Sequence, residues 1–511
     1  MTEAARAIAR RLLRCLLPTF HFSLFTFHSV WAMTPAEAVR AAVADIESLP
    51  AAVRGQTRYL QLTAADEPGR VRQAKALSFL LNSISRVRPL ALPVRMEAAG
   101  RLVRVDLASY ADFKQPSTYR ELFGGWEKLA ETDPYFHLRT QVLVGGQASV
   151  VSGPSSVVSG ERQRTKDNGP RTVTTDGGWV DLGAAARLKQ MSTSFGAVLR
   201  ADYFVARVAG GDYYAWAGVP AKEDDFFRQF GVDAVVLGGL AADSAANLLR
   251  SGVTRKPRRI IQRPGAFGGV WQSKDVDAES PDRDPLRNPV DIDLGKGATQ
   301  KFNFQASEVF ALGANRLWRV AVFDAAGNRT ETVADKVAKD FAGDGIIRPM
   351  LTCIRCHERN GGTGGLQPFH DDQTDLLASA GIRSYLPEVA QRIAELYDNQ
   401  ALGRAMTRDR EDYTDAVARA TGGLTPAEAT DALVAVYAGY TDEQVTPARA
   451  ASELGLAPAQ LFGVLTRSTD PIALALAAGK AVNRAAWESC FAEAALRAAK
   501  ANDEGGMRNA K

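Results

Sequence analysis

Residues 353–357 read Cys-Ile-Arg-Cys-His, two cysteines separated by two residues and followed directly by a histidine. This is the attachment pattern of c-type haem. Each thiol can form a thioether with one vinyl group of a haem, and the adjacent imidazole then lies beneath the porphyrin as a ligand of the iron. The motif occurs once, so we expect one covalent haem c attached to Cys353 and Cys356, with His357 as the iron ligand.

Other uses of these residues stay open at this level. A zinc site built on Cys353, Cys356 and His357 needs a fourth ligand, and Cys490 is the one further cysteine after residue 32. Three ligands so closely spaced would also strain a tetrahedral site. A thioredoxin-like redox pair is disfavoured because no βαβ pattern surrounds the motif, and a structural disulfide is compatible with the spacing. We expect Cys490 to be a small buried apolar residue.

Outward from the motif, the chain becomes helical after residue 340. Apolar residues recur at helical spacing in the segments 386–398, 408–420, 425–438, 446–454, 457–466 and 484–499. Thr425-Pro426-Ala427-Glu428 fits a capping box. We therefore expect residues 341–511 to form an α-helical, cytochrome c-like domain.

The region before the motif mixes both kinds of structure. Helical spacing or capping predicts helices from Thr34-Pro35-Ala36-Glu37 and over 69–85, 118–131 and 183–192, and strands over 90–96, 102–107 and 196–208. Two strands, 317–323 and 330–333, flank the turn 324–328. The predicted class is α+β: a mixed α/β region over 33–300, a β-hairpin connector over 301–340, and the helical domain.

Residues 254–295 are mostly polar and are expected to be loop. A basic run, 255–259, precedes an acidic stretch that begins at Asp275. The acidic spacing does not fit a calcium loop, since Ser280 and Leu286 stand where Gly and Glu are required. We interpret the two runs as solvated charge clusters that face each other.

Length and composition bound the possibilities. The 511 residues correspond to about two to four domains, and 46% hydrophobic with 23% charged residues is ordinary for a globular protein. A net charge of +4 is too balanced to predict a nucleic-acid partner. The chain contains no P-loop, no Gly-x-Ser-x-Gly elbow and no His-Glu-x-x-His motif, so an electron carrier is favoured over a catalyst.

The N-terminus has the pattern of an export signal. Four arginines lie within residues 1–14, a stretch without acidic or strongly basic side chains follows from Cys15, and Val30-Trp31-Ala32 fits a cleavage site. We expect residues 1–32 to be a signal peptide and the mature protein to be periplasmic or secreted, with no stable membrane span. Export agrees with covalent haem, which is attached outside the cytoplasm.

The second axial ligand of the iron determines how the haem works, since Met raises the reduction potential and a second His lowers it. Met406 and His370 are the leading candidates by their distance downstream of the motif. Other candidates depend on tertiary contact or lie in a polar tail: Met96, His137, Met191, Met350 and Met507.

Further segments carry a family resemblance. Ala74 to Ser85 is similar to the helix "ALSKLLNSLS" of large, secreted, mostly uncharacterised bacterial proteins called cytochrome c domain-containing proteins. The elements at 104–107, 133–135, 251–255 and 325–329 follow in that family's order, and the haem motif comes after them. The chain departs from the family at 309–315, where the Pro-Asn-Gly turn is missing, and after His357, where it is rich in glycine. The resemblance implies an extracytoplasmic protein with haem on Cys353, Cys356 and His357.

These observations favour an extracytoplasmic monohaem c-type cytochrome that passes single electrons to a redox partner protein. The alternative is a haem-based sensor or binding module whose sixth iron position is open or displaceable. An enzyme that uses the haem to remove electrons from a substrate ranks last, because the sequence shows no convergent set of polar groups for it.

Overall fold

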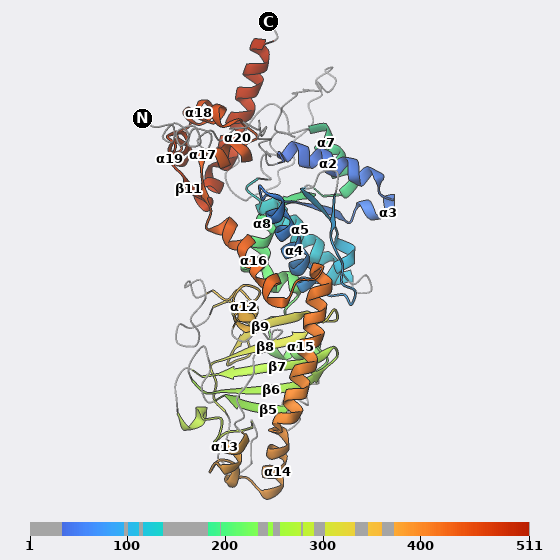
Figure 1. Ribbon diagram of the computed structural model, residues 1–511, viewed down its shortest axis with the longest axis vertical. Coiled ribbons are helices and arrows are strands. Elements are labelled where there is room, and N and C mark those ends of the chain that lie inside the picture. The colour runs from blue at the N-terminus through green and yellow to red at the C-terminus, as the bar shows by residue number, and fades with distance from the viewer. Residues whose placement is uncertain are drawn as a thin grey trace, which may run out of the picture.

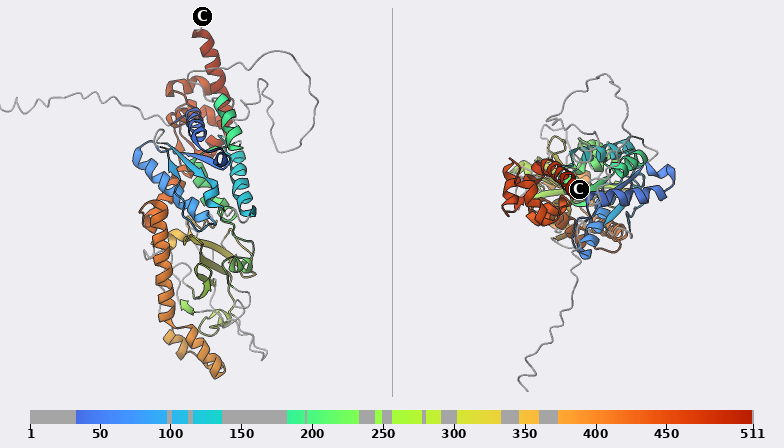
Figure 2. Two further views of the ribbon diagram at one scale, coloured as in Figure 1. Left: turned by 90° about the vertical axis from the view of Figure 1, so that its right-hand side faces the viewer. Right: turned by 90° about the horizontal axis from the view of Figure 1, so that it is seen from above.

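The computed structural model combines helices with two main β-sheets, so the predicted mixed α+β class is confirmed. Figures 1 and 2 show an elongated molecule in which the two sheets follow one another along the long axis. The predicted leader, residues 1–32, lies outside the described residues. The structure describes residues 33–96, 101–111, 116–135, 182–194, 196–232, 244–248, 256–276, 280–290, 302–332, 346–359 and 373–509.

The N-terminal sheet has four strands in the order β2-β3-β1-β4. β1 (Thr57–Gln61) pairs antiparallel with β3 (Leu102–Asp106) and parallel with β4 (Val198–Arg200), and β2 (Val94–Arg95) lies at the edge. Successive side chains of a strand point to opposite faces. Tyr59 therefore packs with the helices α2 (Pro35–Ser48) and α7 (Leu182–Ser192), whereas Leu60 joins the main core with α4 (Glu67–Ile84).

Short-range signals place the N-terminal helices correctly. α2 begins with the predicted capping box, in which Thr34 accepts from the Glu37 amide and Glu37 accepts from the Thr34 amide. α4 and α5 (Pro116–Thr132) cover the segments predicted at 69–85 and 118–131. Short helices of this part include α3 (Ala51–Arg54), α9 (Tyr213–Ala217) and α10 (Glu223–Gln229).

The predicted strand over 196–208 is wrong beyond Arg200. Only Val198–Arg200 are extended, and Ala201–Arg207 form helix α8. Valine and aromatic residues favour a strand in isolation. Here Tyr203, Phe204 and Val205 are all buried, so a helix surrounded by apolar neighbours accommodates them and tertiary packing overrides the local preference.

The second sheet is an antiparallel meander in the order β5-β6-β7-β8-β9. Its strands are Ser244–Leu248 (β5), Arg258–Gly265 (β6), Gly268–Asp275 (β7), Ala306–Leu312 (β8) and Trp318–Asp324 (β9). The turn after β9 is as predicted, with Asp324 accepting from the amides of Ala326 and Asn328. Within the described part of the predicted strand 330–333, residues 330–332, there is a single isolated bridge, Thr332 with Ile346.

The prediction of a loop over 254–295 is also wrong in part, because β6 and β7 lie within it. The two charge runs do face each other, as expected: the Nε atom of Arg258 lies 2.8 Å from Oδ1 of Asp275. The members that lie in the strands are not solvated, since Arg259 and Asp275 are buried, whereas Asp282 of the acidic run is exposed as expected. The charges of the buried members therefore stand within the sheet and contribute to its pairing.

The C-terminal region is helical, with each of the six predicted helices present. It contains α12 (Cys353–Arg359), α13 (Gln373–Ala378), α14 (Pro387–Leu396), α15 (Asn399–Thr421), α16 (Pro426–Thr441), α17 (Pro447–Glu453), α18 (Pro458–Leu465), α19 (Pro471–Ala477) and α20 (Arg484–Asn509). α15 runs along the second sheet and α16 packs on α4 and α8 (Figure 1). The last four helices and the β10–β11 pair (Gln444–Val445 and Val482–Asn483) enclose a separate core, in which Cys490 is buried as expected.

Candidate functional site

The haem motif lies on helix α12. Residues three and four positions apart share one face of an α-helix. Cys353, Cys356 and His357 therefore lie on one face, and each is partly exposed. Neither Cys353 nor Cys356 forms a disulfide in the structure.

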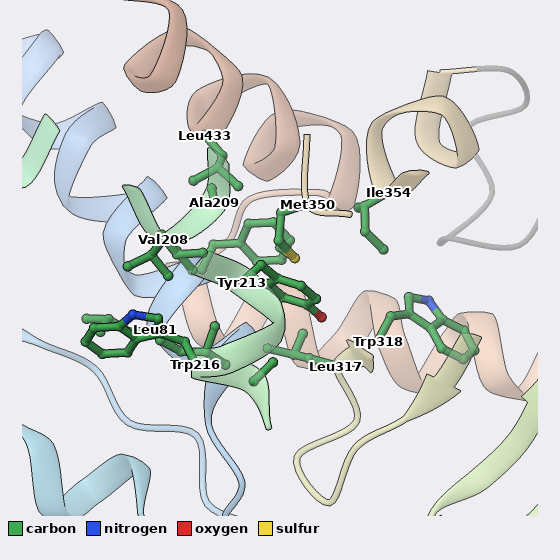
Figure 3. Packing of buried hydrophobic residues seen from close by; sticks show 14 of the residues in the cluster. Leu81, Val208, Ala209, Tyr213, Trp216, Leu317, Trp318, Met350, Ile354 and Leu433 are labelled. Atoms are coloured by element: carbon green, nitrogen blue, oxygen red, sulfur yellow. The ribbon is translucent and has the colours of Figure 1, made fainter. Parts of the chain in front are cut away.

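The buried side of α12 anchors the helix in the main core. Ile354 is 1% exposed, and so is Met350 just before the helix. Figure 3 shows both side chains and Tyr213 directed into the same apolar region from different parts of the chain. Thr352 fixes the start of the helix, since its hydroxyl donates to the Arg348 carbonyl at 2.8 Å. The motif is thus held on a packed element.

Strand β8 supplies the residues that His357 contacts. Glu308 and Phe310 are two positions apart, so they lie on the same face of the sheet. The imidazole ring of His357 packs on Phe310, with ring centroids 4.4 Å apart. The Nε2 atom of His357 lies 3.5 Å from a carboxylate oxygen of Glu308.

The pKa values of Glu308 and Cys353 both depart from their ordinary values. Burial alone would raise the pKa of the Glu308 carboxyl, but the hydrogen bond and the attraction from His357, with a hydrogen bond from Cys353, lower that pKa to about 2. Burial and the Glu308 carboxylate raise the pKa of the Cys353 thiol well above its ordinary value. A thiol held in its protonated form is a weak nucleophile and a weak zinc ligand.

A second acid stands on the same sheet face. Asp275 of β7 pairs with Arg258 of β6, and burial raises the pKa of Asp275 to about 6 in spite of that arginine. Glu308 adds to this rise, because a second negative charge nearby disfavours ionisation of Asp275. Two carboxyl groups and one arginine of the sheet therefore lie close to His357 of α12.

The donor set of α12 fits a c-type haem. Two thiols and one imidazole on a single helix face are the groups that covalent attachment and axial ligation require. Among the residues that the structure describes, no three His, Cys, Asp or Glu side chains are grouped to hold a metal ion by themselves. Iron in haem does not need such a group, because four of its ligands come from the porphyrin.

The candidates for the second axial ligand fall into three sets. Met406 lies on α15 and borders the main core, as Cys353 does, and Met350 is buried within that core. Met96 and Met191 border the cluster between the first sheet, α2 and α7, which is a different core. His137, His370 and the side chain of Met507 lie outside the described residues.

Sequence reasoning missed Glu308 as a site residue. The available signal was one acidic residue within the strand 306–312, whose other positions are small or apolar apart from Ser307. An acid in such a strand is either at a solvated face or paired with a partner from another element. The partner lies 49 positions downstream, and the tertiary fold brings it near.

Comparison with known proteins finds no match to the chain among protein families, curated proteins or solved structures. Across the part of the chain that the structure describes, no helix combines the length and the apolar character that crossing a bilayer requires.

Proposed function

We propose that the protein is an extracytoplasmic monohaem c-type cytochrome. The single observation that carries this is the placement of Cys353, Cys356 and His357 on one face of a short, anchored helix. The thiols would hold the haem covalently and His357 would be an axial ligand. When bound, the haem supplies reversible one-electron transfer between ferric and ferrous iron.

The chain's own residues would give this group its surroundings. Ile354 and Met350 anchor the helix, so the donors on its other face are held in fixed relation to the core. Phe310 and Trp318 line the adjoining apolar region, with ring centroids 5.9 Å apart. An apolar surrounding limits the access of water to a haem and affects its reduction potential. We propose residues 341–511 as the cytochrome c-like part, with Met406 or His370 as second axial ligand.

Location and partner follow from the same proposal. The N-terminal pattern of residues 1–32 would direct export to the periplasm or beyond, where haem c is attached. The partner would be another redox protein that approaches the haem edge. No nucleic-acid partner is proposed, because the net charge of +4 is nearly balanced.

The test is expression with the native N-terminus in a host that matures c-type cytochromes. We expect the denatured protein to have a mass raised by one haem, and its c-type absorption bands to survive extraction with acid and acetone. Cys353→Ala together with Cys356→Ala should abolish attachment. Cys490→Ala is the matched control, since it removes a thiol from the separate C-terminal core and should retain the haem.

His357→Ala tests the ligand assignment. We expect this variant to lose the low-spin spectrum of the wild type. Binding of carbon monoxide to the reduced wild-type protein would indicate an open or displaceable sixth position, as in a sensor. A wild-type protein without haem after expression in the maturing host would refute the cytochrome proposal.

A further inference from the structure

We propose that Glu308 makes an autoinhibitory contact at the haem site: it holds the side chains of His357 and Cys353, and it must release both before haem can be attached. This inference rests on the proposed function, because it concerns the same site. The juxtaposition that carries it is one carboxylate of β8 against two donors of α12, with 3.5 Å between Oε2 of Glu308 and Nε2 of His357.

Both contacts use atoms that haem attachment would need. Nε2 is the ring nitrogen remote from the backbone, so it is the nitrogen of His357 that can reach an iron atom. The thiol of Cys353 donates a hydrogen bond to the same carboxylate. Addition of this thiol across a haem vinyl group forms a carbon–sulfur bond and moves the thiol hydrogen to the neighbouring carbon, so the hydrogen bond to Glu308 is lost. Glu308 and haem therefore exclude each other at both donors.

The sheet fixes the position of the carboxylate. β8 is paired on both sides: Glu308 stands opposite Ser273 of β7 and opposite Val322 of β9. A central strand cannot shift its register by one residue without moving every side chain to the other face. Phe310, two residues further, packs on the imidazole of His357. The strand therefore holds this ring by a polar and an apolar contact at once.

The carboxylate needs the donors of α12 as much as it restrains them. A buried carboxylate is costly unless a partner compensates it. The Glu308 side chain is 18% exposed, and the nearby Arg258 already pairs with Asp275. Cys353 and His357 therefore compensate the charge of Glu308, and the contact is stronger than one with a fully solvated carboxylate.

Release would take place at the side chains, and the helix would stay where it is. Ile354 and Met350 are each 1% exposed, so withdrawal of α12 from the core would bring large apolar side chains into water. Movement of the His357 and Cys353 side chains away from Glu308 costs only their contacts with β8. The anchored helix can therefore keep its place while its donors exchange a carboxylate for haem.

The first experiment measures the affinity of the haem-free protein for ferric haem, from the Soret absorption of the complex. Expression of the full chain in a host without a cytochrome c maturation system supplies this protein, and a reductant keeps its thiols reduced. Glu308→Ala removes the competing carboxylate, and Glu223→Ala is the matched control. Glu223 accepts from Gln272 and from Ser307, the residue before Glu308, so its replacement removes one negative charge at the opposite face of β8.

We expect Glu308→Ala to bind ferric haem about tenfold more tightly than the wild type, the lower end of what a hydrogen bond to a charged group contributes. Glu223→Ala should bind as the wild type does, which separates competition for the donors from a general effect of charge. Measurable but equal affinities of the wild type and Glu308→Ala, or weaker binding by this variant, would overturn the proposal. If Glu308→Ala does not fold, Glu308→Gln takes its place, because it keeps the shape but is a weaker acceptor, and an unchanged affinity would again refute the proposal.

A measurement without haem separates this inference from the proposed function. Alkylation of the reduced, haem-free protein by iodoacetamide, followed by peptide mass spectrometry, gives the rate at Cys353, with Cys356 as a reference in the same molecule. Glu308→Ala should raise the ratio of the two rates, and Glu223→Ala should leave it unchanged. That result without haem on the matured wild type would refute the cytochrome and retain the contact that holds the donors. An unchanged ratio in Glu308→Ala would refute the autoinhibitory contact whether or not haem is attached.

Discussion

Replacement of Glu453 by glutamine should destabilise the protein more than any exposed glutamate change. The carboxylate is 6% exposed and receives three guanidinium groups: Arg200 at 2.7 Å, Arg484 at 2.8 Å and Arg449 at 3.0 Å. The indole Nε1 of Trp487 also donates to it at 2.8 Å. Burial alone would raise the pKa of the Glu453 carboxyl, but the three arginines hold that pKa well below its ordinary value.

The magnitude follows from the charges that remain. Glutamine keeps the shape of the side chain but removes the negative charge among three arginines, two of which are almost fully buried. Breaking a buried ion pair by removal of one partner costs about 3–5 kcal/mol. Arg200 retains Asp202 and Arg484 retains Glu443, so we expect a loss within this range.

The assay is urea unfolding at neutral pH, with Glu493→Gln as the matched control. Glu493 lies on α20, is 44% exposed and pairs with Arg497 at 2.8 Å, an exposed pair worth less than about 1 kcal/mol. The network around Glu453 joins α17 and α20 to Arg200 of β4, so hydrogen exchange in Glu453→Gln should rise first in the C-terminal core. A loss no larger than that of Glu493→Gln would refute the reasoning.

Two further predictions concern the second sheet. Asp409 of α15 is fully buried and accepts from the Gly269 amide at 2.9 Å and from the Trp271 indole at 2.8 Å. Asp409→Ala leaves both donors without their acceptor, so we expect urea unfolding to show a loss of about 2–6 kcal/mol in the free energy of unfolding. A loss below about 1 kcal/mol would contradict this. Burial raises the pKa of Asp275 from 3.8 to about 6, so the folded protein binds the carboxyl proton more tightly than the unfolded chain does. The contribution of Asp275 to the free energy of unfolding therefore falls as the pH rises from the lower to the higher of these pKa values. The melting temperature of the wild type relative to Asp275→Asn should therefore decline between about pH 4 and pH 6 and level off above, and a constant difference would show that Asp275 titrates normally.

The elements that the sequence predicts well are those with local signals. The capping boxes at Thr34 and Thr425 begin helices where expected, because the bonds involved span only three residues. Apolar spacing identified the C-terminal helices for the same reason, although it passed over α19, whose small and apolar residues, 471–477, show no contrast between faces.

The failures occur where long-range contacts decide the structure. β6 contains Arg258, Arg259 and Arg263, and such a charged segment reads as loop. In the fold, Arg258 pairs with Asp275, and the guanidinium groups of Arg259 and Arg263 lie over the rings of Phe302 and Phe227. Partners that lie up to 43 residues away in sequence make these arginines compatible with a strand, and no local pattern reveals them.

The same reasoning explains what the sequence reveals about the candidate site. The donors Cys353, Cys356 and His357 form a contiguous motif, so the chain alone identifies them. Glu308 and Phe310 belong to strand β8, far from the motif in sequence. They reach His357 only because β8 pairs within the second sheet and α12 packs on that sheet.

The long region before the motif also gains a physical role. The main core unites Ile354 of α12 with Phe310 of β8, Tyr213 of α9 and Leu81 of α4, so residues from both halves of the chain surround the motif helix. The reduction potential of haem depends on burial and on hydrogen bonds to its ligands. If haem is bound at α12, residues that precede the motif, such as Phe310 against His357, would supply part of that burial.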